Sequence, residues 1–73
     1  MFAMPKRPIE PGRRYRELRR GPFGRAAGVE WIVEGVTDRL GLRHARLVSA
    51  VDLTRRKTLS VRELADPSRF EEV

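Results

Sequence analysis

The chain has 73 residues, no cysteine and a net charge of +6. A chain of this length forms one domain and buries only roughly 60% of its unfolded surface. Without disulfides or thiolate metal sites to stabilise it, self-association is a reasonable source of further burial, and a homodimer is one such form. No run approaches the roughly 18 apolar residues of a membrane span, and the start does not fit a signal peptide, which predicts a cytoplasmic location in a bacterium or archaeon.

The charged residues are distributed unevenly. Residues 1–28 contain eight Lys/Arg and two Asp/Glu, whereas residues 29–73 contain eight of each. The basic character therefore belongs to the N-terminal part. Asparagine and glutamine are absent as well, a composition typical of thermophile proteins. The excess of arginine over lysine fits a GC-rich genome equally well.

Residues 1–12 are predicted to form a basic, proline-rich arm that precedes a single domain of residues 13–73. Pro5, Pro8 and Pro11 recur at a spacing of three, which favours an extended, polyproline-like conformation and excludes helix. We expect residues 1–10 to be poorly ordered in a free monomer, because they contain few apolar side chains that could anchor them. A basic arm ordered by a partner is the functional alternative.

The first element of the domain is ambiguous. Residues 13–20 suit a short helix, because Tyr15 and Leu18 are spaced i and i+3 and Gly21 can end a helix. A strand is preferred here, since a barrel needs a first strand. Residues 21–28 contain three glycines and one proline and are predicted to form a loop between strands.

The most regular strand signal lies in residues 29–36. Val29, Trp31 and Val33 alternate with Glu30, Ile32 and Glu34, so one face is apolar and the other is mixed, which is the period of a half-buried strand. Gly35 interrupts this alternation and predicts a bulge. A connecting loop over residues 37–43 then turns at Gly41.

A hairpin is predicted from two further strands, residues 44–52 and 58–64. The polar stretch between them places Arg55, Arg56 and Lys57 at the tip of the loop. Ser60 and Glu63 fit the capping-box pattern, so a short helical turn near residue 64 is compatible with the sequence.

A turn at Asp66 and Pro67 precedes the last segment, residues 70–73, which is predicted to be a short closing strand. The fold class is therefore all-β: a small antiparallel barrel of about five strands with a short helical turn near the C-terminus. The predicted core consists of Val29, Trp31, Val33, Leu47, Val51, Leu59, Val61 and Phe70.

This layout resembles small bacterial proteins with an SH3-like barrel, many of them of unassigned function. The resemblance covers residues 11–73. It depends on a Pro-Gly pair before Tyr15, the strand from Trp31 to Val36, the hairpin with a basic tip, and the segment Asp66–Phe70. It implies a barrel similar in shape to modules that bind RNA, DNA or peptides, and it does not choose among these ligands.

The patterns that would indicate an enzyme are missing. The single histidine, His44, lies beside Arg43 and Arg46 and is predicted to be an exposed residue at the end of a strand. No Gly-x-Ser-x-Gly motif places a nucleophile, and no cofactor or metal site is expected. We therefore expect a binding protein with no enzymatic activity.

Nucleic-acid binding is the first functional hypothesis. The N-terminal arginines can neutralise phosphates, and Tyr15, together with Phe23, can stack on bases, as in single-strand binders. The basic hairpin tip would extend this surface. The predicted binding residues are Arg13, Arg14, Tyr15, Arg16, Arg19, Arg20, Arg25, Arg55, Arg56 and Lys57.

The alternative is a protein-interaction or self-assembling module without a role in nucleic-acid binding. Small antiparallel sheets expose strand edges that can pair with a second copy or with a peptide. The placement of the arginines separates the two hypotheses. One contiguous basic face with aromatic residues favours nucleic acid, whereas arginines paired with Glu30, Glu34 and Glu63 favour structure or assembly.

Overall fold

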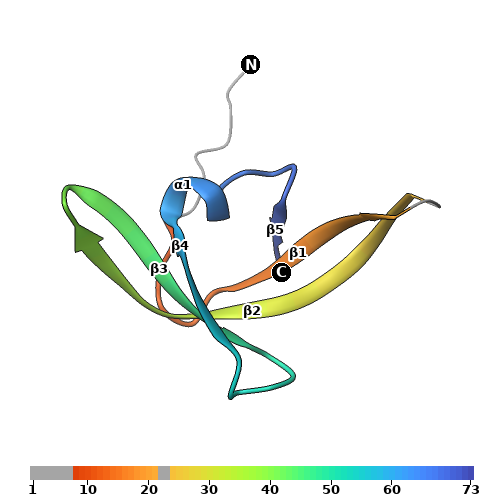
Figure 1. Cartoon of the computed structure of the whole chain (residues 1–73), viewed down its shortest axis with the longest axis horizontal. Coiled ribbons are helices and arrows are strands. Elements are labelled where there is room, and N and C mark those ends of the chain that lie inside the picture. The colour runs from red at the N-terminus through yellow and green to blue at the C-terminus, as the bar shows by residue number, and fades with distance from the viewer. Residues whose placement is uncertain (1–7, 22–23) are drawn as a thin grey trace.

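The computed structural model of the chain describes residues 8–21 and 24–73, with backbone alone for residues 19–21 and 24–27. Five antiparallel strands form a single sheet in the order β4-β3-β2-β1-β5 (Figure 1). The elements are β1 Arg14–Gly21, β2 Gly24–Arg39, β3 Leu42–Ser49, β4 Arg56–Ser60, α1 Val61–Leu64 and β5 Phe70–Glu72. The prediction of five antiparallel strands with a short helical turn is therefore confirmed, whereas the described strands do not close into the predicted barrel. No ladder among the described residues joins the edge strands β4 and β5, so the sheet remains open between them.

The strand preferred for residues 13–20 is confirmed, but the loop predicted for residues 21–28 is wrong. β1 continues to Gly21 and β2 begins at Gly24. Leu18 pairs with Ala27, and Arg20 pairs with Arg25. Glycine lowers the strand propensity of this stretch but does not prevent its backbone from forming a ladder, and a single hairpin places the two segments opposite each other.

The bulge predicted at Gly35 is confirmed, because the register between β2 and β3 shifts between Val33 and Gly35. The loop predicted for residues 37–43 is much shorter. β2 continues to Arg39, and only Leu40 and Gly41 form the turn, with φ angles of 52° and 80°. Two successive residues with positive φ are typical of the tight type I′ hairpin turn.

The hairpin of β3 and β4 is confirmed with different bounds. β3 ends at Ser49, whose hydroxyl oxygen accepts hydrogen bonds from the backbone N–H groups of Val51 and Asp52. The chain therefore leaves the sheet before Val51, which is exposed, so its predicted core position is wrong. Val61 lies in α1 and not in a strand, and it is half-buried.

The C-terminal turn signals are confirmed. The Ser60 hydroxyl accepts a hydrogen bond from the N–H of Glu63 at 3.1 Å and caps α1. Asp66 accepts hydrogen bonds from the N–H and the hydroxyl of Ser68, which stabilise the following turn. This turn leads into β5, which pairs with β1 and buries Phe70.

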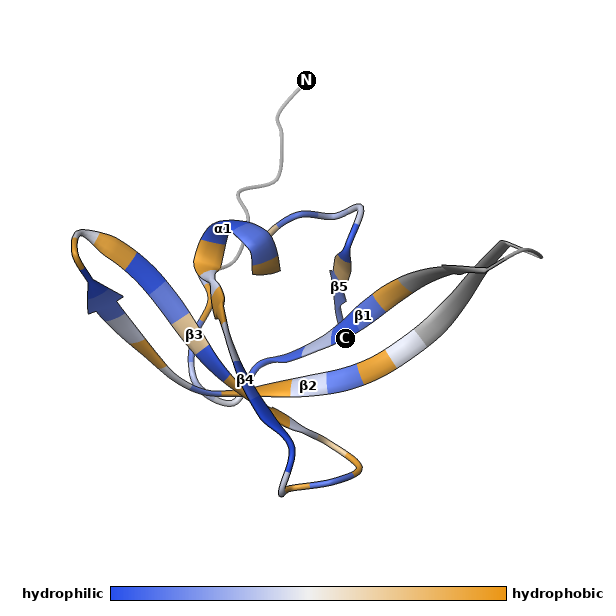
Figure 2. Ribbon diagram, viewed as in Figure 1, coloured by the Kyte–Doolittle hydropathy of each residue, from blue (hydrophilic) through white to orange (hydrophobic). Residues whose placement is uncertain are grey.

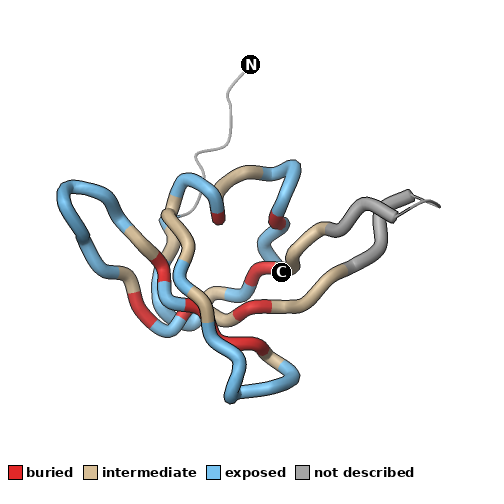
Figure 3. Tube along the Cα trace, viewed as in Figure 1, coloured by how far each residue is buried: buried red, intermediate tan, exposed pale blue. Residues whose placement is uncertain are grey.

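The core lies in the concave centre of the sheet, and the β2–β3 turn and the β3–β4 loop are exposed (Figure 3). Hydrophobic and hydrophilic residues are interspersed along the described part of β2 (Figure 2). Trp31 and Val33, two residues apart, are both buried, as the strand period requires. The buried cluster contains four of the predicted positions. Its members are Tyr15, Trp31, Val33, Ala45, Leu47, Leu64 and Phe70, with Ile9, Val29, Val36 and Leu59 packed against it.

The end of the N-terminal arm contacts the domain. Ile9 packs against the core, and the N–H of Gly12 donates a hydrogen bond to the carbonyl of Val33 at 2.9 Å. These contacts count against disorder for residues 8–10. Residues 1–7, for which disorder was also predicted, lie outside the described part of the chain.

Candidate functional site

Arg13, just before β1, and Arg14 and Arg16 at its start are held by acidic side chains of neighbouring strands. The pairs are Arg13 with Glu72 at 2.6 Å, Arg14 with Glu30 at 3.3 Å and Arg16 with Glu71 at 2.9 Å. Each pair is partly exposed and is therefore worth about 0.2–1 kcal/mol. The consequence for function is larger, because a guanidinium that already faces a carboxylate attracts phosphate less strongly.

The three basic residues predicted at one hairpin tip lie in different environments. Arg55 is exposed in the loop, whereas Arg56 and Lys57 belong to β4. Arg56 pairs with Glu34 at 3.0 Å. The prediction of a basic tip formed by all three is therefore wrong, because β4 starts two residues earlier than the alternation of apolar residues suggested.

Lys57 belongs to a compact cluster over the core. Its Nζ lies 2.7 Å from a carboxylate oxygen of Glu17 and 4.4 Å from the centre of the Trp31 ring. The indole N–H of Trp31 donates a hydrogen bond to the same carboxylate oxygen at 3.2 Å. The buried tryptophan thus has a polar partner, and the lysine is held by both a charge and an aromatic face.

Tyr15, predicted as a stacking residue, lies in the core and is only 6% exposed. Burial raises the pKa of its hydroxyl above the usual value of 10.0, and the nearby carboxylate of Glu72 raises this pKa further. The ring would have to leave the core before it could stack on a base.

The remaining predicted residues, Arg19, Arg20 and Arg25, lie on the distal part of the β1–β2 hairpin. We call residues 18–21 and 24–27 the β1–β2 ribbon. Arg20 is directly opposite Arg25, and Arg19 is opposite Ala26. Phe23, the other predicted stacking residue, lies outside the described residues.

A groove lies between the end of the arm, α1 and β5, and sequence reasoning did not predict it. We call it the α1–β5 groove. Its volume is about 490 Å³, within the usual range for ligand sites. It is lined by Pro8, Ile9, Tyr15, Arg43, Val61, Leu64, Ala65, Pro67, Phe70, Glu71 and Glu72.

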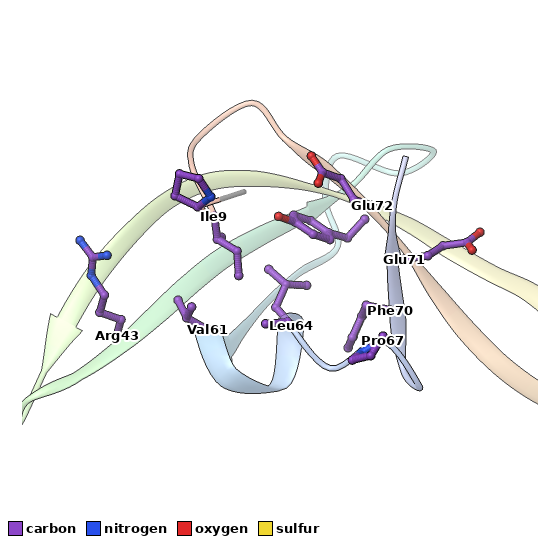
Figure 4. A pocket seen from close by; sticks show the side chains of 11 residues that line it. Ile9, Arg43, Val61, Leu64, Pro67, Phe70, Glu71 and Glu72 are labelled. Atoms are coloured by element: carbon purple, nitrogen blue, oxygen red, sulfur yellow. The ribbon is translucent and has the colours of Figure 1, made fainter. Parts of the chain in front are cut away.

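Charged side chains mark the two ends of the α1–β5 groove. Figure 4 shows Arg43 at one end and Glu71 and Glu72 at the other, with apolar side chains between them. Each of these charges already has a partner within the chain, and Arg43 lies 3.5 Å from Asp38. The groove therefore presents a mainly apolar surface with little unbalanced charge.

The signal for this groove was present in the sequence but incomplete. The capping box and the turn at Asp66 predicted that the chain would reverse after β4, and both features position the α1 wall. The other wall depends on Ile9, which was assigned to a disordered arm. A groove between segments so far apart in sequence follows from tertiary packing, which local patterns do not encode.

Comparison with known proteins gives no assignment: no family model, no curated protein and no solved structure matches the chain. Among residues 8–21 and 24–73, no three His, Asp or Glu side chains are grouped so that they could hold a metal ion. In the same part of the chain, no helix has both the length and the apolar character needed to cross a bilayer.

Proposed function

We propose that the chain is a small, non-enzymatic protein-interaction module with an SH3-like strand arrangement, which binds an extended apolar segment of a partner protein in the α1–β5 groove. The observation that supports this choice is the pairing of Glu30, Glu34 and Glu63 with arginines, the arrangement expected for structure or assembly. Among the described side chains, six arginines and Lys57 form ion pairs with acidic residues, which removes many cations from a phosphate-binding surface.

The chemistry of the groove defines the class of ligand. Tyr15, Leu64 and Phe70 provide a buried apolar floor, and Val61 lies on the α1 wall. Because the charges at both ends are already paired, the ligand is recognised by burial of its apolar side chains. Such binding is nearly independent of salt, since few counterions are released.

The test uses peptides selected from a random display library on the immobilised full chain. Val61→Asp places a charge in the groove at the first position of α1, where an acidic residue favours the helix. We expect it to weaken binding of a selected peptide at least about tenfold, or 1.4 kcal/mol. Val51→Asp is the matched control, because Val51 is exposed and does not line the groove.

The outcomes separate the alternatives. Binding that is equal at about 50 and about 500 mM salt and is lost only in Val61→Asp supports the proposal. Peptides that bind both variants equally, or a library without any binder, would contradict it. Sedimentation equilibrium of both variants determines whether a second copy of this chain occupies the groove.

A second candidate function is nucleic-acid binding by the ribbon arginines. The specific observation is that residues 18–29 contain three arginines and no acidic residue, so this part of the chain has no internal counter-charge. If these arginines contact phosphates, affinity must fall steeply with salt. Absence of any binding to DNA or RNA at about 50 mM salt would exclude this function.

A further inference from the structure

The β1–β2 ribbon extends past the rest of the sheet. β5 pairs with β1 only at residues 15–17, and β3 pairs with β2 only from Trp31 onward. Among the described ladders, the outer edges of the ribbon therefore have no further strand (Figure 1). An isolated two-stranded hairpin is marginally stable in water, so an element without a flanking strand is well suited to being stabilised by a partner.

The charges of the ribbon identify the partner. Arg20 and Arg25 are directly opposite, and like charges at such positions destabilise a strand pair. Elsewhere in the described ladders, arginines oppose acidic or uncharged residues, such as Glu71 opposite Arg16 and Asp38 opposite Arg43. The ribbon therefore combines ladder edges that have no flanking strand with two arginines directly opposite each other, and a polyanion would relieve the repulsion between them.

The shape of the ribbon favours a duplex over a single strand. The major groove of B-form DNA admits a two-stranded β-ribbon, whereas the deep and narrow major groove of A-form RNA does not. Apart from Leu18 and the arginines, the ribbon consists of glycine and alanine, so its backbone can approach closely. Of the aromatic residues that the structure describes, Tyr15, Trp31 and Phe70 are buried, so these three rings are not available for the base stacking of single-strand binders.

We propose that the β1–β2 ribbon binds B-form duplex DNA in the major groove, with Arg19, Arg20 and Arg25 neutralising phosphates. This inference rests on the second candidate function and specifies its ligand and its site. A register shift between Arg16 and Leu18 marks the base of the ribbon. Such bulges bend and twist a strand pair, which separates the direction of the ribbon from that of the sheet.

The experiment measures fluorescence anisotropy with three probes of one mixed sequence: duplex DNA, duplex RNA and single-stranded DNA. We expect duplex DNA to bind about tenfold more tightly than the other two, because it alone offers a major groove of suitable width. Replacing Arg19, Arg20 and Arg25 together with alanine should flatten the slope of log K against log salt on duplex DNA by about 2.7, at about 0.9 per phosphate.

Two control variants keep the result specific. Replacing Arg39, Arg46 and Arg62 with alanine removes the same charge from exposed positions outside the ribbon, and this variant should retain the slope. Replacing Arg19, Arg20 and Arg25 with lysine should retain most of the affinity, because phosphate neutralisation needs only the charge. Circular dichroism of each variant confirms that the fold is intact.

The results distinguish failure of the function from failure of the inference. No binding to any probe excludes the candidate function itself. Binding that is equal or tighter on single-stranded DNA or duplex RNA retains the function but refutes a major-groove site on B-form DNA. Equal losses in the two alanine variants would show that net charge, and not the ribbon, attracts the nucleic acid.

Discussion

At the scale of single residues, Trp31 contacts both the buried core and the polar side chains of Glu17 and Lys57 that lie over it. Its ring is 5% exposed, its N–H reaches Glu17, and its face lies beneath the Lys57 ammonium. An aromatic residue with all three contacts cannot be truncated without leaving both a cavity and an unpaired polar group. Its importance was predictable, because it is the only tryptophan and occupies the most regular strand pattern.

Trp31→Ala should lower the free energy of unfolding by about 3–5 kcal/mol, the usual range for truncating a buried aromatic. That is comparable to the whole stability of a small domain, about 5 kcal/mol. Urea unfolding followed by circular dichroism measures the change. Val51→Ala, at an exposed position, should change the stability by less than about 0.5 kcal/mol, and a similar loss in both variants would disprove the core assignment.

The raised pKa of Tyr15 predicts that the folded chain loses stability at alkaline pH. Because burial and Glu72 raise the pKa of the folded tyrosine, the folded chain keeps a proton that the unfolded chain releases above pH 10. Stability from this group is complete below the unfolded pKa and is lost as pH rises through the folded pKa. Tyr15→Phe should therefore show a smaller decrease in melting temperature above pH 10 than the original chain; parallel profiles would contradict the assignment.

At the scale of elements, the tight turn between β2 and β3 contains an unfavourable residue. Leu40 is fully exposed at a φ of 52°, a conformation that costs most non-glycine residues roughly 1–2 kcal/mol. Leu40→Asn should stabilise the chain by about 1 kcal/mol, because asparagine tolerates this conformation in type I′ turns. Thermal unfolding measures the gain, and Leu42→Asn, in β3, should show none.

One substitution in the ribbon should have opposite effects on stability and on DNA binding. Arg25→Glu places a carboxylate opposite Arg20 and should stabilise the strand pair by about 0.2–1 kcal/mol, as expected for opposite charges across a ladder. The same change removes the proposed phosphate contact of Arg25 and adds a repulsive charge, so DNA binding should weaken. Amide hydrogen exchange in β1 measures the first effect and anisotropy the second. A variant that gains both stability and affinity would contradict the proposed role of Arg25.

At the scale of the whole molecule, the sequence predicted the strands whose alternation is regular and missed features set by packing. Trp31, Val33 and the bulge at Gly35 were predictable because strand period and glycine chemistry are local. The pairing of Arg20 with Arg25 was not predictable, because the glycine-rich composition of residues 21–28 indicated a loop and not a pair of strands. The ion pairs of the arginines and the α1–β5 groove depend on segments that meet only after folding. The sequence therefore predicted the basic residues by type, but it predicted neither their ion pairs nor the α1–β5 groove.

The pairing of the first and last strands has a consequence for the order of folding. Residues 15–17 of β1 meet residues 70–72, so this ladder closes a loop of more than fifty residues, whose entropic cost grows with its length. The local hairpins of β2, β3 and β4 can form before it, which assigns β5 to a late step. Phe70→Leu should then mainly accelerate unfolding, whereas Val33→Ala should slow refolding, because only early contacts influence the folding rate. Stopped-flow chevron plots of the two variants measure both rates. During synthesis, before residue 70 leaves the ribosome, β2, β3 and β4 could already be paired. The outer edge of β1 would then still lack its partner strand, β5.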